Sequence, residues 1–177
     1  MIRAVWNDME RHVLSILVAN EPGVLSRISG LFSRRGYNIE SLTVGRTEHP
    51  EVSRITVSLT CDDSTLEQIM KQSEKLYVVR AVEELKPKDS VYRELALVKF
   101  KADEAARGPI RGVVDIFRAS IVDIGPESLI VEITGDGDKI DAFIKVVESY
   151  GIIEMTRTGL TALGRGSQGI TDHLTDF

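Results

Sequence analysis

One order of secondary-structure elements occurs twice along this chain, about 80 residues apart, and it constrains the fold more than any other feature. The first copy begins with the β-rich apolar run His12–Val18, continues with a helical pattern over Val24–Phe32, and ends in a strand-like run that closes at Leu85. The order strand, helix, strand, strand, helix, strand recurs between Glu94 and Thr158. The sequence therefore predicts an α+β chain with two ferredoxin-like βαββαβ domains in tandem.

The first predicted helix is amphipathic and has a defined end. Its apolar residues fall on one helical face: Val24, Leu25, Ile28, Leu31 and Phe32. Gly36 follows, and a glycine there favours a left-handed helix end. Ser64 and Glu67 have the spacing of a capping box, so we predict that the second helix begins there. Both helices are expected on one face of an antiparallel sheet.

A polar segment that contains a proline, Lys86–Ser90, separates the two copies. We therefore predict one domain over 12–86 and a second over 92–159. The segment 160–177 is rich in Gly, Ser and Thr and has no apolar periodicity. It is predicted to be a flexible tail.

The first predicted strand is apolar on both of its faces. Neighbouring positions carry large aliphatic side chains: Val13, Leu14, Ile16 and Leu17. A strand with one solvated face would alternate instead. Because both helices lie on one face of the sheet, water, another domain or another subunit must cover the opposite face. This pattern suggests assembly into a homodimer.

Charge and cysteine content narrow the possible partners. The net charge is −5 and the sequence pI is about 5.3, which opposes binding to nucleic acid or to an anionic membrane. The strand-like run Val52–Thr60 lacks the aromatic residues on which RNA-binding sheets stack bases. The single cysteine, Cys61, excludes an intrachain disulfide, and Met1–Glu10 lacks a signal-peptide core. We expect a soluble cytoplasmic protein.

The segment between the first strand and first helix, Asn20–Leu25, has the chemistry of an anion site. The first amides of a helix lack intrahelical partners and lie at the positive end of its dipole, where a carboxylate fits. Gly23 permits close approach to the backbone, and Asn20 can donate to a carboxylate and accept from an ammonium group. A purely structural alternative remains, because Asn20 is also a good helix N-cap and Pro22-Gly23 is a common turn.

The same segment resembles the Asx-x-Pro-Gly-x-Leu signature of ACT domains, which bind amino acids allosterically. The longer string that continues to Val44 resembles the small regulatory subunits of acetolactate synthase (acetohydroxyacid synthase). Phe117–Asp123 and Leu160–Gly166 fit the same family, so the resemblance covers roughly His12–Gly166.

The resemblance implies a valine site in the first, ACT domain, used as a homodimer. Its residues would be Asn20, Pro22, Gly23, Val24, Leu25, Asn38, Ile39 and Gly45. Asn38 would face the turn of a neighbouring subunit, and Val24, Leu25 and Ile39 are suitable neighbours for an apolar side chain. Some relatives have Ala where this chain has Gly45, which could enlarge the pocket or loosen its strand.

The resemblance also implies a role in branched-chain amino-acid biosynthesis. The chain would activate a catalytic large subunit and confer feedback inhibition by valine. No cofactor is expected on this chain, whereas thiamine diphosphate, Mg²⁺ and FAD are expected on the partner. An ACT-type sensor that regulates a different biosynthetic enzyme is the alternative.

Other motifs with a chemical appearance fail in context. Gly164–Gly169 spells G-x-G-x-x-G, but the acidic residue expected about 20 positions later has no room. Gly135–Asp138 lacks the spaced ligands of a calcium loop and predicts a turn with a helix N-cap. Asp62 and Asp63 beside Cys61 should raise the pKa of that thiol. The three histidines are far apart in the sequence and indicate no metal site. We therefore predict a non-catalytic chain.

Overall fold

The computed structural model describes residues 9–173. It divides into two compact units, one made of residues up to Val91 together with those from Leu160 onward, and one made of Tyr92–Gly159. Residues 1–8, where no signal peptide was predicted, and residues 174–177 of the predicted tail lie outside the described residues. In the part of the chain that is described, no helix is long and apolar enough to cross a membrane.

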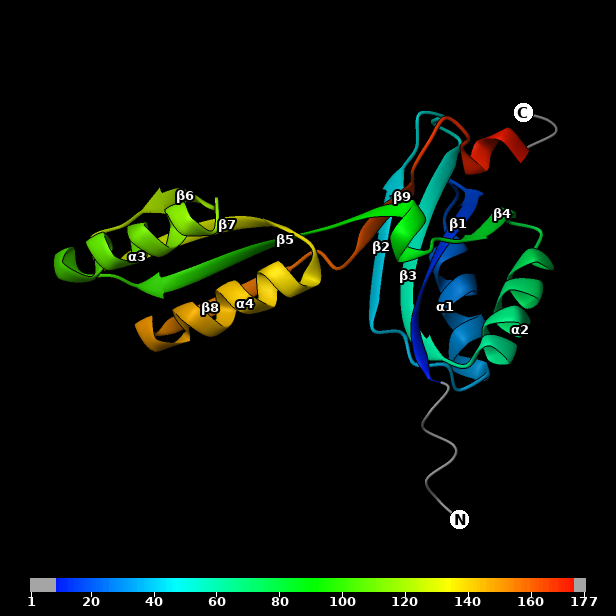
Figure 1. Ribbon diagram of the computed structural model, residues 1–177. Coiled ribbons are helices and arrows are strands. Elements are labelled where there is room, and N and C mark those ends of the chain that lie inside the picture. The colour runs from blue at the N-terminus through cyan, green and yellow to red at the C-terminus, as the bar shows by residue number, and fades with distance from the viewer. Residues whose placement is uncertain (1–8, 174–177) are drawn as a thin grey trace, which may run out of the picture. The chain divides into compact units, whose positions relative to one another are not determined.

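The first unit contains a four-stranded antiparallel sheet in the order β2-β3-β1-β4, with two helices on one face (Figure 1). Its elements are β1 (Glu10–Ala19), α1 (Val24–Arg34), β2 (Ser41–Arg46), β3 (Val52–Cys61), α2 (Asp63–Glu74) and β4 (Val79–Glu84). The order and pairing confirm the predicted ferredoxin-like fold.

The amphipathic pattern of α1 has the predicted consequence. Four of its residues, Val24, Ile28, Leu31 and Phe32, are buried, and all but Leu31 belong to the core cluster that includes the sheet. Gly36 has φ 71°, which confirms the left-handed end. The predicted N-cap residue of α2 was wrong. The Asp62 side chain, not that of Ser64, caps the helix by accepting a hydrogen bond from the backbone N–H of Thr65.

The second unit repeats the topology, with strand order β6-β7-β5-β8 and both helices packed on one face. Its elements are β5 (Ser90–Lys101), α3 (Glu104–Ile116), β6 (Ser120–Ile124), β7 (Ser128–Gly135), α4 (Gly137–Val147) and β8 (Ile152–Arg157). Asp136 accepts from the backbone N–H of Lys139 at 2.9 Å, which confirms the predicted N-cap of α4. The predicted linker is a 3₁₀ turn, η1 (Pro87–Asp89), and β5 begins directly after it.

The segment after Gly159 is ordered as far as the description extends, so the predicted flexible tail is wrong over 160–173. It forms β9 (Thr161–Gly164), which pairs with β5, and a 3₁₀ turn, η3 (Ile170–His173). Leu160 is buried, accepts from Thr43 Oγ1 at 2.8 Å and donates to Ser41 Oγ at 2.9 Å. Ile170 packs on Leu17 and Val52. Buried Leu160 and Ala162 alternate with exposed Thr161 and Leu163, a pattern too short to identify a strand, and Ile170 stands alone among polar residues.

This segment explains why β1 is apolar on both faces. Leu14 and Ile16 belong to the core beneath the helices, whereas Leu17 points to the opposite face and is covered with Ile170. All residues of β1 from His12 to Ala19 are buried. The chain therefore covers the second face with its own C-terminal segment, and the apolar pattern of β1 gives no support to a homodimer.

Candidate functional site

The turn between β1 and α1 is the first part of the candidate site. Gly23 is the N-cap residue of α1, has φ 83°, and no side chain caps the helix there. Asn20 is therefore not the helix N-cap that the structural alternative assigned to it. Its Nδ2 donates to the carbonyl of Pro50 at 2.8 Å, and its backbone N–H donates to that of Glu51 at 2.7 Å. Asn20 thus ties the turn to the β2–β3 hairpin.

These bonds revise the chemistry expected of Asn20. One of the two N–H groups of its side-chain amide is used by the protein, which leaves one as the carboxylate donor expected from the sequence. The side-chain Oδ1 takes part in no hydrogen bond among the described residues and can accept from an ammonium group. A carboxylate would also meet the uncapped first turn of α1, which contains no acidic residue.

The three apolar candidates differ in accessibility. Val24 is buried, and both Val24 and the half-buried Ile39 pack in the core of the first unit. Leu25 is 45% exposed in the first turn of α1, close to the uncapped amides. Of the three, Leu25 is therefore the side chain placed to contact a ligand, while Val24 and Ile39 position the backbone.

Asn38 lies at the opposite end of the domain from Asn20. Asn20 follows Ala19, which pairs with Val52, whereas the start of β2 pairs with Ser58. The six steps from Val52 to Ser58 correspond to about 20 Å of strand. Asn38 is exposed there, just before β2. One copy of the chain therefore does not bring Asn20 and Asn38 together.

Gly45 lies on β2, the edge strand of the sheet, near the same end as Asn20. It pairs with Arg54, and Leu17 pairs with the same arginine from the other side. A Cβ built on Gly45 would meet nothing within 4 Å, so no contact within one copy requires glycine. The exposed residues Val44–Arg46 leave this edge accessible.

Both parts of the chain match models of one family. Residues 14–81 match the acetohydroxyacid synthase small subunit-like ACT domain, and residues 93–166 match the small subunit of acetolactate synthase. An acetolactate synthase small subunit from Mycolicibacterium smegmatis is 48% identical over 93% of this chain and 96% of its own length. The chain belongs to the acetolactate synthase small-subunit family. The probable small subunit of Methanothermobacter thermautotrophicus is 49% identical over 91% of this chain and 96% of its own length.

A solved structure extends this family match to three dimensions. The crystal structure of the acetolactate synthase small subunit from Thermotoga maritima has 42% sequence identity and a TM-score of 0.85. The alignment covers 90% of this chain and 99% of that one. The tandem domains are thus the architecture of this small-subunit family.

Sequence reasoning missed a cavity of about 360 Å³ on the helix-free face of the first sheet. Gly45 and Arg54 line it from the sheet, and Ala162 lines it from β9. Arg54 donates to Ser15 Oγ at 3.2 Å. The cavity was missed because residues 160–173, which were predicted to form a flexible tail, supply part of its lining. The one available signal was a charged residue, Arg54, within the otherwise uncharged strand Val52–Cys61.

The thiol of this small-subunit chain is in an unreactive environment. Burial, together with the negative charges of Asp62, Asp63 and Glu84, raises the pKa of Cys61 to about 11. The predicted effect of the two aspartates is therefore confirmed. Among residues 9–173, no group of three or more His, Cys, Asp or Glu side chains is arranged to hold a metal.

Proposed function

We propose that this chain is the regulatory subunit of an acetolactate synthase in branched-chain amino-acid biosynthesis. It binds a catalytic large subunit in the cytoplasm, raises the activity of that subunit, and makes it sensitive to valine. The observation that carries this proposal is the near full-length identity to acetolactate synthase small subunits, which includes both domains. The match of the second domain disfavours the alternative of an ACT sensor for a different enzyme.

The regulatory site requires two copies of the first domain. An edge strand has unpaired backbone groups, and a second β2 can pair with it in antiparallel orientation. Because antiparallel pairing reverses one copy, it brings Asn38 of one copy toward the Asn20 and Gly45 end of the other. The equivalent edge of the second domain, β6, has a bulge between Ile121 and Asp123, and a bulge blunts an edge. The homodimer is therefore proposed to form through the first domain.

The polar groups at this seam match an amino acid. The first turn of α1 receives the carboxylate, Asn20 Oδ1 accepts from the ammonium group, and Asn38 of the second copy contributes its amide. Leu25 and Val44, both about half exposed, offer contacts to an isopropyl group. One methylene changes discrimination by about 1–3 kcal/mol, so leucine and isoleucine bind more weakly than valine but measurably.

The reaction itself belongs to the catalytic partner. Thiamine diphosphate, Mg²⁺ and FAD are proposed to bind there, as the family resemblance implies. Valine acts through linkage. It favours one mutual orientation of the paired domains, and a different orientation holds the partner active. A coupling of about 1–3 kcal/mol, or roughly 5–150-fold in affinity, is sufficient for feedback control.

Reconstitution at a fixed concentration of catalytic subunit tests the function. Added chain should increase acetolactate formation from pyruvate, and valine should reverse the increase. Asn20→Ala and Asn38→Ala should keep activation while losing inhibition and calorimetric valine binding. Gln68→Ala, which removes an exposed amide on α2, is the matched control and should retain both properties. Failure of the chain to activate any acetolactate synthase would sink the proposal.

Sedimentation equilibrium tests the dimer. Val44→Lys places a charge on the β2 edge and should shift the chain toward monomer. Val122→Lys makes the same change on the bulged β6 edge, where Val122 is 53% exposed against 48% for Val44, and should leave association unchanged. Equal effects of the two variants would contradict pairing through β2.

A further inference from the structure

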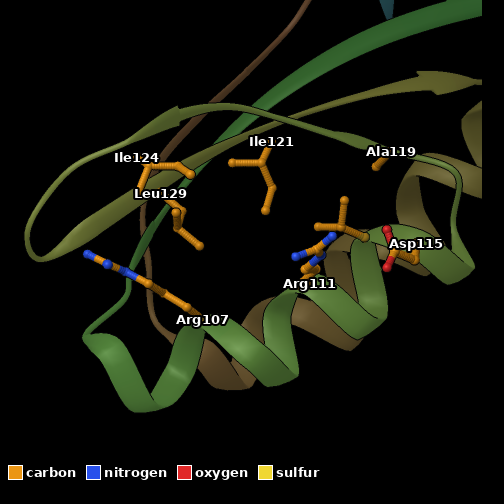
Figure 2. A pocket seen from close by; sticks show the side chains of 8 residues that line it. Arg107, Arg111, Asp115, Ala119, Ile121, Ile124 and Leu129 are labelled. Atoms are coloured by element: carbon orange, nitrogen blue, oxygen red, sulfur yellow. The ribbon is translucent and has the colours of Figure 1, made fainter.

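A groove of about 400 Å³ lies within the second unit between α3 and β6 (Figure 2). This volume falls in the range of small-molecule sites, about 300–1,000 Å³. The proposed valine site involves none of these residues, and the family resemblance assigns them no ligand. The groove is formed entirely by the compact unit Tyr92–Gly159.

One side of the groove is aliphatic. Ile124 and Leu129 pair across β6 and β7, so both side chains project to the face that carries α3, and Ile121 adds a third contact. Leu129 is buried, whereas Ile124 is 65% exposed. A large aliphatic side chain left open beside a cavity provides a surface on which a short hydrocarbon chain can be buried.

The opposite side is cationic. Arg107 and Arg111 are one helical turn apart on α3, so they project to the same side of the helix (Figure 2). Arg107 Nη2 donates to the carbonyls of Gly125 and Pro126, at 2.6 and 2.9 Å, and these bonds hold its guanidinium in place. Its Nε is buried and has no partner among the described residues. Arg111 is exposed and forms no ion pair there. The exposed guanidinium of Arg111 thus remains available to a ligand in the groove.

The balance of charge defines the ligand. Asp115, a further turn along α3, also lines the groove, so the three charged side chains sum to +1. A carboxylate next to guanidinium groups forms charge-assisted, often bidentate hydrogen bonds. We propose that this groove binds a small aliphatic monocarboxylate.

Titration of the full-length ¹⁵N-labelled chain with 3-methylbutanoate tests the proposal. Saturable shifts should appear for amides around Arg111 and Ile124. The neutral isostere 3-methylbutanamide should bind at least about tenfold more weakly, because charged hydrogen bonds are lost. Asn38→Ala should leave the groove shifts unchanged, which separates this site from the proposed valine site.

Two substitutions test the role of charge. Arg111→Gln should weaken 3-methylbutanoate binding about tenfold, whereas Arg111→Lys should retain part of it. Arg93→Gln removes an exposed guanidinium elsewhere in the second unit and should have no effect. The spectrum of each variant reports whether the unit is still folded.

Several outcomes would overturn the proposal. One is the absence of saturable shifts at millimolar 3-methylbutanoate. Others are equal binding of the amide, unchanged binding by Arg111→Gln, or shifts confined to the first domain. If Arg111→Gln instead weakens affinity for the catalytic chain while no carboxylate binds, the groove is a protein contact and not a ligand site.

Discussion

The two units share one topology but differ in how the helix-free face of the sheet is covered. In the first unit, every residue of β1 from His12 to Ala19 is buried. The equivalent strand of the second unit, β5, alternates between buried and half-buried positions over Glu94–Phe100. The difference arises because Leu160 and Ile170 pack onto the first sheet, and no such segment belongs to the second unit. A strand that is apolar at consecutive positions therefore indicates that both faces of its sheet are buried. The segment that buries the second face can belong to the same chain.

Removal of the C-terminal segment that covers the first sheet should produce the largest loss of stability. A chain that ends at Gly159 exposes the face around Leu17 and Val52 and loses the burial of Leu160 and Ile170. Each buried aliphatic side chain contributes about 1.5–3 kcal/mol, so the first unit should lose at least about 3 kcal/mol. Hydrogen exchange should show faster exchange in β1 and β3.

The second unit serves as the internal control for this truncation. Protection of β5 and β7 should be unchanged, because the deleted residues belong to the first unit. Equal loss of protection in both units would show that the C-terminal segment stabilises the chain by some other route than covering the first sheet.

A matched pair of substitutions measures the same difference at single residues. Leu17 is 0% exposed, whereas Leu97 occupies the helix-free face of the second sheet and is half-buried. Leu17→Ala should cost about 3 kcal/mol and Leu97→Ala less than about 1.5 kcal/mol. Urea denaturation followed by a probe specific to each unit gives both values. Similar costs would mean that the two faces are equally covered.

The sequence was sufficient to predict the tandem fold, because the strand and helix periodicities of each half are strong and local. It also located the β1–α1 turn, where Gly23 adopts the conformation that glycine favours. It was insufficient where distant residues meet. The segment that covers the first sheet consists of the four-residue strand β9 with Leu160 and of the single residue Ile170, too little for a periodic pattern. The bond from Asn20 to Pro50 joins positions 30 residues apart and leaves no local pattern.

Alkaline pH should also distinguish the units, because Cys61 lies in the first. The folded-state pKa of this thiol is raised from 9.0 to about 11, so folding favours the neutral form. The stabilising contribution is full below pH 9 and is lost as pH rises toward 11, with an effect on the order of 1–2 kcal/mol. Cys61→Ala should remove this component from the urea stability measured between pH 8 and 11. An unchanged pH profile in the variant would show that other groups titrate instead.

The smallest effects should come from two glycines, one in each unit. A Cβ on Gly45 meets open space, whereas one on Gly135 would lie 2.6 Å from Lys139 Cδ and 3.2 Å from its Cβ. Gly45→Ala should therefore change stability by no more than about 0.5 kcal/mol, with a gain favoured by the lower entropy of the unfolded chain. Gly135→Ala should lower stability by about 1 kcal/mol, because the side chain of Lys139 must move. In the variant, that movement strains the hydrogen bond from Lys139 Nζ to the carbonyl of Thr134.

If Gly45→Ala is as stable as expected yet weakens valine binding or association, its methyl group meets a second copy, as pairing through β2 requires. If stability, association and valine affinity are all unchanged, the β2 edge tolerates a side chain at this position, and the seam does not need a glycine there.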